Sequence, residues 1–191
     1  MTILVDMDDT IEQLLRAWLE GVNKKYGRSA AYDDVRDWNV AAVYPGLTWE
    51  EVYTVPLEPD FWKTVKPIPG AAEGLKKLMD DGHDVYIVTA TPYQSVSEKM
   101  TDLLFKYFPF LSWNQVIITM RKQMIRGDVL IDDGVHNLEG GAYAKILMTA
   151  PHNRDYDAEA NGMIRVDDWD GVLRAVEELE RKNTERTGSL E

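Results

Sequence analysis

The sequence contains no cysteine, no long apolar run and an excess of acidic over basic residues. The absence of cysteine from all 191 residues excludes disulfides, thiolate nucleophiles and cysteine-ligated metal sites. It also fits a reducing compartment, and we expect a cytoplasmic location. No run approaches the roughly 18 apolar residues that a membrane span needs, and the opening MTILVDMDDT lacks the basic segment of a signal peptide. We therefore expect no membrane partner.

The charge balance indicates the kind of partner. The chain carries 33 acidic and 21 basic residues, a formal net charge of -12. A surface of this sign repels nucleic acid polymers, so we expect a small molecule that binds at a locally positive site. Assembly into a homodimer is a further expectation that the composition leaves open.

Short apolar runs alternate with amphipathic helical patterns, which is typical of strand–helix–strand units and a parallel sheet. The runs are nearly continuous in apolar residues, as in central strands covered on both faces. We predict a Rossmann-like α/β fold. The expected strands cover 3–5, 84–89, 115–119, 128–133, 144–150 and 163–166, and the expected helices cover 71–82, 95–108 and 170–182.

One segment departs from this alternation. Residues 14–66 contain helical patterns and several tryptophans but no convincing buried strand. We predict that they form a mostly helical cap, inserted after the first strand, and that residues 1–13 and 67–183 form the core. The polar segment 184–191 is expected to be a disordered tail, in which Leu190 and Glu191 are remnants of cloning.

Polar residues gather where the predicted strands end, and in a parallel sheet these ends meet along one edge, where ligands bind. We therefore expect them to converge on one crevice. The strand ends are Asp6-Met7-Asp8-Asp9-Thr10, Thr89-Ala90-Thr91, Met120-Arg121-Lys122 and Asp132-Asp133.

This set of groups suits phosphoryl transfer through a carboxylate. One carboxylate can attack phosphorus, while a second acid protonates the leaving oxygen and later activates water. Asp6 and Asp8 can supply these two groups. Crowded carboxylates call for a cation, and Mg²⁺ is the usual one. Thr89 and Lys122 fit the hydroxyl and the lysine that bind phosphoryl oxygens.

The motif Asp6-x-Asp8-x-Thr10 after an apolar strand resembles the first motif of the haloacid-dehalogenase (HAD) superfamily phosphatases. Thr89 resembles the second motif, and Lys122 with the strand end DVLIDD resembles the third and fourth. Within the superfamily, the resemblance is strongest to the 5′(3′)-deoxyribonucleotidase family. It rests on EPDFWKTVKPIPGAAEGLKKL, on VTATP and on RKQMIRGDVLIDD.

The resemblance implies a phosphatase for nucleoside monophosphates. It implies that Asp6 is the nucleophile and Asp8 the acid/base, and that Thr89, Ala90 and Lys122 lie on the phosphate. Mg²⁺ is then expected on Asp6, on the main-chain oxygen of Asp8 and on one aspartate of a pair. Neighbouring side chains of an extended segment point opposite ways, so one member of the pair Asp132 and Asp133 should bind the metal, and Asp133 is favoured. Phe61 and Trp62 match aromatic positions that face the nucleotide.

Three positions depart from the family pattern. Asp9 replaces a glycine, Ala90 replaces a hydroxyl residue, and Leu14 replaces an aromatic that would stack on the base. These changes leave the hydrolytic residues intact and leave the preference for base and sugar open.

Alternative interpretations stand beside these assignments. Arg121 and Arg126 are basic alternatives to Lys122, and Phe61 and Trp62 can simply pack the interior of the cap. The substrate can be another small phosphoester, such as a sugar phosphate or phosphoglycolate. The chain can also transfer phosphate between substrates, or serve as a non-catalytic binding module, although it retains both Asp6 and Asp8.

Overall fold

The computed structural model describes residues 1–188, and these contain a six-stranded sheet in which all neighbouring strands are parallel. The strands follow the spatial order β3-β2-β1-β4-β5-β6. This confirms the predicted Rossmann-like α/β fold. The strands are β1 (Thr2–Val5), β2 (Asp84–Thr89), β3 (Val116–Ile118), β4 (Val129–Asp132), β5 (Ala144–Met148) and β6 (Met163–Val166).

Helices of very different length connect the strands. They are α1 (Leu14–Tyr26), α2 (Trp49–Tyr53), α3 (Ala71–Asp80), α4 (Val96–Glu98), the π-helix η6 (Lys99–Leu104), α5 (Phe105–Tyr107), α6 (Val135–Leu138) and α7 (Trp169–Gly188). Single 3₁₀ turns are η1 (Tyr32–Asp34), η2 (Val40–Val43), η3 (Val55–Leu57), η4 (Phe61–Lys63), η5 (Tyr93–Ser95), η7 (Trp113–Gln115), η8 (Lys122–Met124) and η9 (Pro151–Asn153). Among residues 1–188, no helix combines the length and the apolar character needed to cross a lipid bilayer.

Successive strand residues point to opposite faces of the sheet, and both faces are buried. Ile3 and Val5 join the larger apolar cluster, which also contains side chains of α3, η6 and α7. Leu4, between them, joins a smaller cluster with Leu138 of α6 and Tyr143. This double burial explains why the strands are continuously apolar in the sequence.

A glycine sets how closely α3 and α7 pack. A Cβ atom on Gly74 would lie 2.3 Å from Cε3 of Trp169, so the tryptophan ring fits only against a bare backbone. Trp169 also donates its indole N–H to the carbonyl oxygen of Thr10, over 3.0 Å. The first residue of α7 therefore helps to hold the loop that follows β1.

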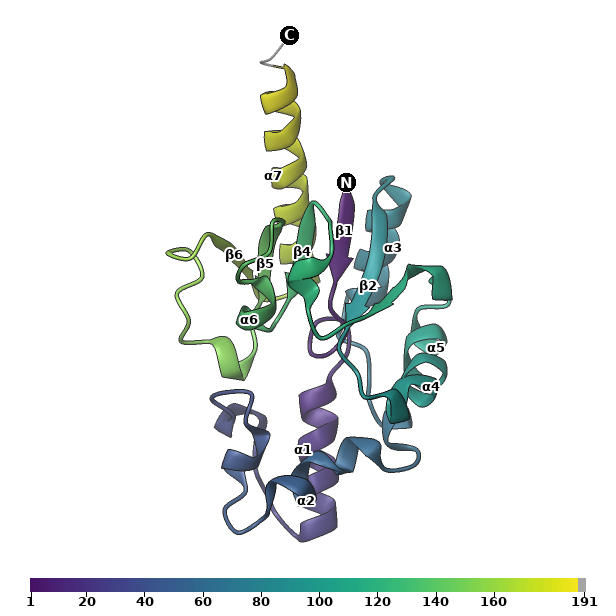
Figure 1. The fold of residues 1–191 in the computed structure, drawn as a ribbon, viewed down its shortest axis with the longest axis vertical. Helices are drawn as coiled ribbons and strands as arrows, with labels where there is room; N and C mark the ends of the chain where they lie inside the picture. The colour runs from purple at the N-terminus through teal and green to yellow at the C-terminus, as the bar shows by residue number, and fades with distance from the viewer. Residues whose placement is uncertain (189–191) are drawn as a thin grey trace.

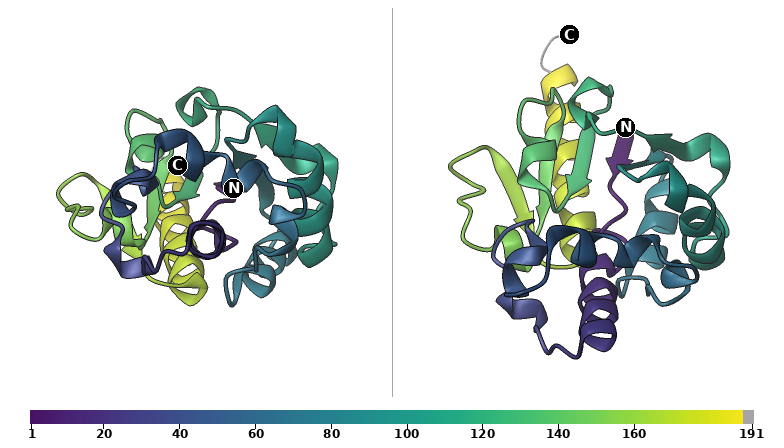
Figure 2. Two further views of the ribbon diagram at one scale, coloured as in Figure 1. Left: turned by 90° about the horizontal axis from the view of Figure 1, so that it is seen from below. Right: turned by 60° about the horizontal axis from the view of Figure 1, so that its bottom comes forward.

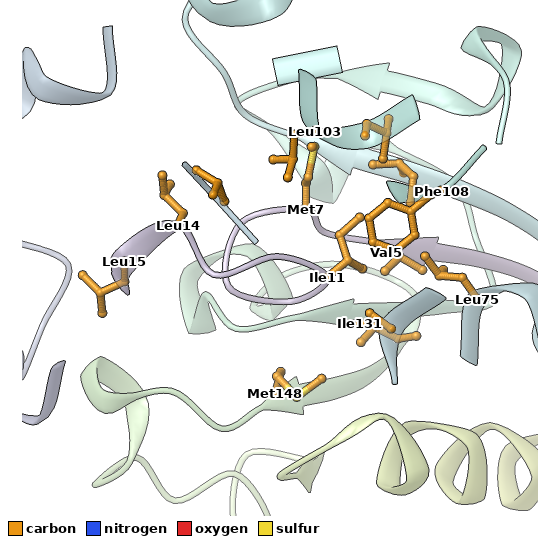
Figure 3. Close-up of a cluster of buried hydrophobic side chains, with 14 of the residues drawn as sticks. Val5, Met7, Ile11, Leu14, Leu15, Leu75, Leu103, Phe108, Ile131 and Met148 are labelled. Atoms are coloured by element: carbon orange, nitrogen blue, oxygen red, sulfur yellow. The ribbon is translucent and has the colours of Figure 1, made fainter. Parts of the chain in front are cut away.

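Apolar side chains anchor this loop from the other direction. Met7 and Ile11 are fully buried and lie in the same cluster as Val5 and Phe108 (Figure 3). Because Met7 points into the core, its two neighbours Asp6 and Asp8 are free to serve the polar edge of the sheet. The local sequence thus alternates anchoring and functional side chains.

Residues 14–66 contain helices and turns and no strand, as the sequence predicts. Figures 1 and 2 show α1 and α2 beyond the carboxyl ends of the strands, opposite the free end of α7. The two connections between this cap and the core run side by side. Gln13 N donates to Lys66 O and Ile68 N donates to Ile11 O, each over 2.9 Å.

Two elements differ from the sequence prediction. The helix expected over 95–108 is divided, because the π-helix η6 interrupts it. Helix α7 also continues through residues 184–188, where a disordered tail was expected. Ion pairs one turn apart support this extension, at 2.6 Å between Lys182 and Glu178 and 3.9 Å between Arg181 and Glu185. Residues 189–191, including the predicted cloning remnant, lie outside the described part of the chain.

Candidate active site

The candidate site lies at the carboxyl ends of β1 and β4, where the strand order reverses direction. Open α/β sheets bind their ligands at such a switch point. Asp6 follows β1 directly, Asp132 is the last residue of β4, and Asp133 comes next. The three carboxylates are buried, and each offers an oxygen within 4.8 Å of the others. The structure therefore brings together three of the residues that the sequence analysis selected.

Lys122 is the basic residue that reaches these carboxylates. It lies in η8, and its Nζ is 2.5 Å from Asp6 Oδ1 and 2.7 Å from Asp132 Oδ2. Arg121 and Arg126, the alternatives from the sequence, are exposed. Burial raises the pKa of Asp6 to about 7, although Lys122 opposes the shift. Asp6 and Asp132 in turn raise the pKa of Lys122 against the effect of burial, so the lysine stays charged.

The two neighbouring aspartates have different hydrogen-bond partners. Asp132 accepts from Lys122 on Oδ2, and from Gly134 N at 2.7 Å and Asn137 Nδ2 at 3.0 Å on Oδ1. Asp133 Oδ2 is buried and accepts no hydrogen bond from the described residues. Burial raises the pKa of both carboxyl groups. His152 Nε2 lies 3.2 Å from Asp133 Oδ2, but no lysine or arginine of the described residues pairs with it, so Asp133 can accept a further cation.

A second cation lies beside Asp8. Thr89 ends β2, and Lys99 Nζ is 3.1 Å from its Oγ1 and 2.5 Å from Asp8 Oδ1. Burial acts to raise the pKa of Asp8, but Lys99 and the hydrogen bond from Glu12 outweigh it, and the pKa is lowered. Ala90 follows Thr89, is half-buried and adds only a methyl group.

Comparison with known proteins places this geometry in a family. The family described as "5' nucleotidase, deoxy (Pyrimidine), cytosolic type C protein" (NT5C) matches residues 1–181. A 5′(3′)-deoxyribonucleotidase of Bacillus subtilis (strain 168) is 34% identical over 181 residues, covering 94% of this chain and 96% of that protein. The chain belongs to the 5′(3′)-deoxyribonucleotidase family.

Further relatives agree with this membership. A 5′(3′)-deoxyribonucleotidase of Clostridium acetobutylicum is 30% identical over 168 residues, which cover 88% of this chain and 90% of the other. A HAD family hydrolase from Deinococcus radiodurans R1 shares the fold, with a TM-score of 0.59 at 16% identity over 94% and 96% of the two chains. The predicted family and enzyme class are thus confirmed, and this deoxyribonucleotidase-family protein is a phosphatase.

The family departure at Asp9 has a local explanation. Asp9 has φ 50°, a left-handed conformation that glycine adopts easily and aspartate adopts more readily than most residues. Its carboxylate oxygens accept a hydrogen bond from Leu15 N, at 3.2 and 3.0 Å. Asp9 therefore caps the first turn of α1 and joins the cap to the catalytic loop.

Glu12 is a buried acid that the sequence analysis did not select. It is fully buried, and neither carboxyl oxygen accepts a hydrogen bond from an N–H or hydroxyl group of the described residues. Burial raises the pKa of Glu12 well above its ordinary value, and the neighbouring Asp8 raises it further. Glu12 and Asp8 are therefore two neighbouring buried acids whose pKa values shift in opposite directions.

The adjacent aromatic residues Phe61 and Trp62 have different surroundings. Phe61 lines a cavity of about 580 Å³ together with Ala17, Gly21 and Val55 of the cap. Trp62 instead places its ring centre 4.9 Å from Lys99 Nζ, and its buried indole N–H has no acceptor among the described residues. The structure thus brings Trp62 to the site, whereas the described contacts of Phe61 lie within the cap.

Two residues near Asp133 could not be selected from the sequence. His152 Nε2 lies 3.2 Å from Asp133 Oδ2, and the Trp38 ring packs against the His152 ring, tilted by 36° with the ring centres 4.4 Å apart. No metal-ligand spacing marks His152, and its neighbours come from segments far apart in the chain.

Lys99 did leave a signal in the sequence, because it lies three residues after Val96 and four before Leu103, on the apolar stripe of its helical pattern.

Proposed function

We propose that this protein is a Mg²⁺-dependent phosphomonoester hydrolase that forms an aspartyl phosphate on Asp6 and acts on nucleoside monophosphates, deoxyribonucleotides foremost. The observation that carries the proposal is the buried group of Asp6, Asp132 and Asp133, with carboxylate oxygens within 4.8 Å of one another. Lys122 touches Asp6 at 2.5 Å and supplies a positive charge for a bound phosphoryl group. Family membership supports the same chemistry.

The donor set fits Mg²⁺, which prefers carboxylate and carbonyl oxygens. Asp6, the main-chain oxygen of Asp8 and Asp133 would hold the ion, because Asp133 lies in the same group of carboxylates as Asp6 and, unlike Asp132, is not paired with Lys122. Asp132 would support the site by holding Lys122 in place. When bound, Mg²⁺ neutralises negative charge on the phosphoryl oxygens and helps to orient them.

In the first step, an oxygen of Asp6 attacks phosphorus and the bond to the ester oxygen breaks. The leaving oxygen takes a proton from the Asp8 carboxyl group. In the second step, Asp8 takes a proton from water, whose oxygen attacks phosphorus and releases inorganic phosphate and free Asp6. The pKa of Asp8 is lowered in the free protein, and the negative charge of an arriving phosphate favours its protonation.

The substrate assignment rests on the relatives and on the cap. The two relatives above are named 5′(3′)-deoxyribonucleotidases, and Trp62 offers an aromatic surface beside the catalytic residues. Thr89 and Lys122 are proposed to bind the phosphoryl oxygens, with the main chain at Ala90 beside them. The cytoplasmic location and the homodimer stay predictions from the sequence.

The test is free phosphate release, measured with Mg²⁺ on a panel of substrates. The panel holds ribo- and deoxyribonucleoside 5′- and 3′-monophosphates, sugar phosphates and phosphoglycolate, each assayed also with Asp6→Asn. We expect deoxynucleotides to be hydrolysed fastest and the variant to be inactive. Faster hydrolysis of a sugar phosphate would overturn the substrate assignment, and an isomerised phosphoester as product would indicate a phosphoryl transferase.

Metal dependence gives a separate prediction. We expect EDTA to abolish turnover and Mg²⁺ to restore it, because four carboxylates and a phosphate would otherwise repel one another. We also expect Asp133→Asn to raise the Mg²⁺ concentration for half-maximal activity more than Asp132→Asn does. Turnover that persists after thorough chelation would contradict the proposed metal dependence. A larger rise in the required Mg²⁺ concentration for Asp132→Asn than for Asp133→Asn would assign the ligand to Asp132.

A further inference from the structure

Lys99 is a fully buried cation to which the proposed mechanism gives no task. Among the described residues, Lys99 and Lys122 are the buried lysines. An unpaired ammonium group costs several kcal/mol, on the order of a whole protein's stability, when it leaves water. Such a residue needs partners, and those of Lys99 are Asp8 and Thr89. Lys122 contacts Asp6 and Asp132, so each of the two lysines pairs with different carboxylates of the site.

The local backbone aims Lys99 at the site. Lys99 is the first residue of the π-helix η6, whose following residues Met100, Leu103 and Leu104 are buried in the core. A π-turn is rare, and such turns often occur at functional sites. The aliphatic stem of Lys99 thus runs among core residues while its ammonium group reaches Asp8. The Trp62 ring, with its centre 4.9 Å from Nζ, lies against this group from the cap.

The direction of the hydrogen bonds limits what each partner can do. An ammonium group has three donors and no acceptor, so Lys99 must donate to Asp8 Oδ1 at 2.5 Å and to Thr89 Oγ1 at 3.1 Å. Because the Thr89 oxygen is occupied as an acceptor, its own hydrogen is left to donate to another oxygen. Because Asp8 Oδ1 is held, the orientation of the carboxyl group that is proposed to exchange a proton with substrate or water is fixed.

We propose that Lys99 is a positioning residue that orients both the Asp8 carboxyl group and the Thr89 hydroxyl group toward the phosphoryl group. This inference rests on the proposed function, since it requires Asp8 to act as the acid and base. Lys99 itself need not touch the substrate. Its effect should therefore be felt most where proton transfer by Asp8 limits the reaction.

The experiment compares Lys99→Met with wild type on two substrates. A deoxynucleoside monophosphate has a poor leaving group that needs a proton, whereas p-nitrophenyl phosphate releases a stable anion that needs none. We expect Lys99→Met to lower kcat on the nucleotide by about 10²-fold, within the range for general acid–base catalysis, with little change in KM. The first-turnover release of p-nitrophenolate, followed by rapid mixing, should fall less than about tenfold, since this leaving group needs no proton and only the orientation of Thr89 is lost.

Two further variants make the comparison specific. Lys106→Met removes an exposed lysine from the adjacent helix α5 and should leave both reactions unchanged. Asp8→Asn combined with Lys99→Met should be less than about tenfold slower than Asp8→Asn alone, because only the orientation of Thr89 remains to be lost and residues that act through one another are not additive. If the losses in the double variant add, Lys99 acts independently of Asp8 and the proposal is wrong.

Other outcomes also decide the question. An equal loss of rate on both substrates would show that Lys99 is only a structural counter-ion. Unchanged kinetics in Lys99→Met would show that Lys99 has no part in the reaction. If Lys99→Met does not fold, Lys99→Gln can replace it, because glutamine keeps a hydrogen-bond donor in the same pocket. The test is then the same: a larger loss of rate on the nucleotide than on p-nitrophenyl phosphate. A failure of the proposed function is separately visible, because Asp6→Asn would then retain the wild-type release of phosphate.

Discussion

Two regions of this protein are buried to the same degree with opposite consequences. At the carboxyl edge of the sheet, Asp6, Asp132 and Asp133 are 5%, 0% and 1% exposed. In the apolar layer beneath α3 and α7, Leu75, Phe108 and Trp169 are 0%, 0% and 2% exposed. Burial alone therefore does not distinguish the regions. The chemistry of the buried groups does.

In the apolar layer, burial is the source of stability. Each large apolar side chain removed from water contributes about 1.5–3 kcal/mol. In the carboxylate cluster, burial is a cost, which Lys122 and Lys99 offset by direct contact. The comparison teaches that the fold tolerates an unfavourable region where two lysines and several hydrogen bonds compensate it, while the layer below supplies the free energy of folding.

The largest effect is expected from Asp6→Asn, which should separate activity from stability. We expect turnover to fall by at least about 10⁴-fold, since the proposed nucleophile is lost. The melting temperature should change little, because Lys122 keeps Asp132 as a counter-ion. Phosphate release and thermal unfolding, measured on the same preparation, check both parts. A variant that unfolds far below wild type would show that the cluster also stabilises the fold.

Phe108→Ala should have the reverse profile. Phe108 is fully buried in the larger apolar cluster, and such truncations cost about 3–5 kcal/mol. At roughly 2–4 °C per kcal/mol for a chain of this size, the melting temperature should fall by about 6–20 °C. At temperatures where the variant is folded, kcat should stay within about twofold of wild type, because general packing does not touch the reacting groups. A large loss of kcat in the folded variant would show that the apolar layer contributes to catalysis as well as to stability.

The smallest effect is expected from Asp9→Gly, at the boundary between the two regions. The change removes the hydrogen bonds to Leu15 N, which cap α1, but it also removes a buried carboxylate and suits φ 50° better. Because these contributions oppose one another, the free energy of unfolding should change by no more than about 1 kcal/mol. Chemical denaturation measures this change, and a loss several times larger would show that Asp9 belongs with the structural layer.

The strands were predictable because two-sided burial leaves a direct trace in the sequence. Runs such as DVYIVT and DVLIDD are continuously apolar and then end in Thr89 or in the aspartate pair, and the structure ends β2 and β4 at these positions. Parallel pairing then follows from the helical patterns between the runs. The convergence of Asp6, Thr89, Lys122 and the aspartate pair was accessible for the same reason.

Several features could be established only from the tertiary structure. Lys99 belongs to a helical stripe that is otherwise apolar, and the π-helix that aims it at Asp8 breaks the expected period. His152 meets Asp133 and Trp38 through folding alone, since the three come from separate segments. The helix through residues 184–188 was missed because a polar sequence predicts a tail and a solvated helix equally well.

By itself, the sequence determined the sheet, the order of the motifs and the residue types available for chemistry, because periodic burial and motif spacing are local properties of the chain. Tertiary structure decided which groups share a partner. Lys122 pairs with Asp6 and Asp132, Lys99 pairs with Asp8, and Asp133 has the His152 ring beside it. Tertiary structure also placed Trp62 beside Lys99, while Phe61, whose ring meets Trp62 edge-on at 5.4 Å, lines the cavity of the cap. Pairing of charges depends on distances of a few ångströms between distant segments, and only packing of the whole chain sets those distances.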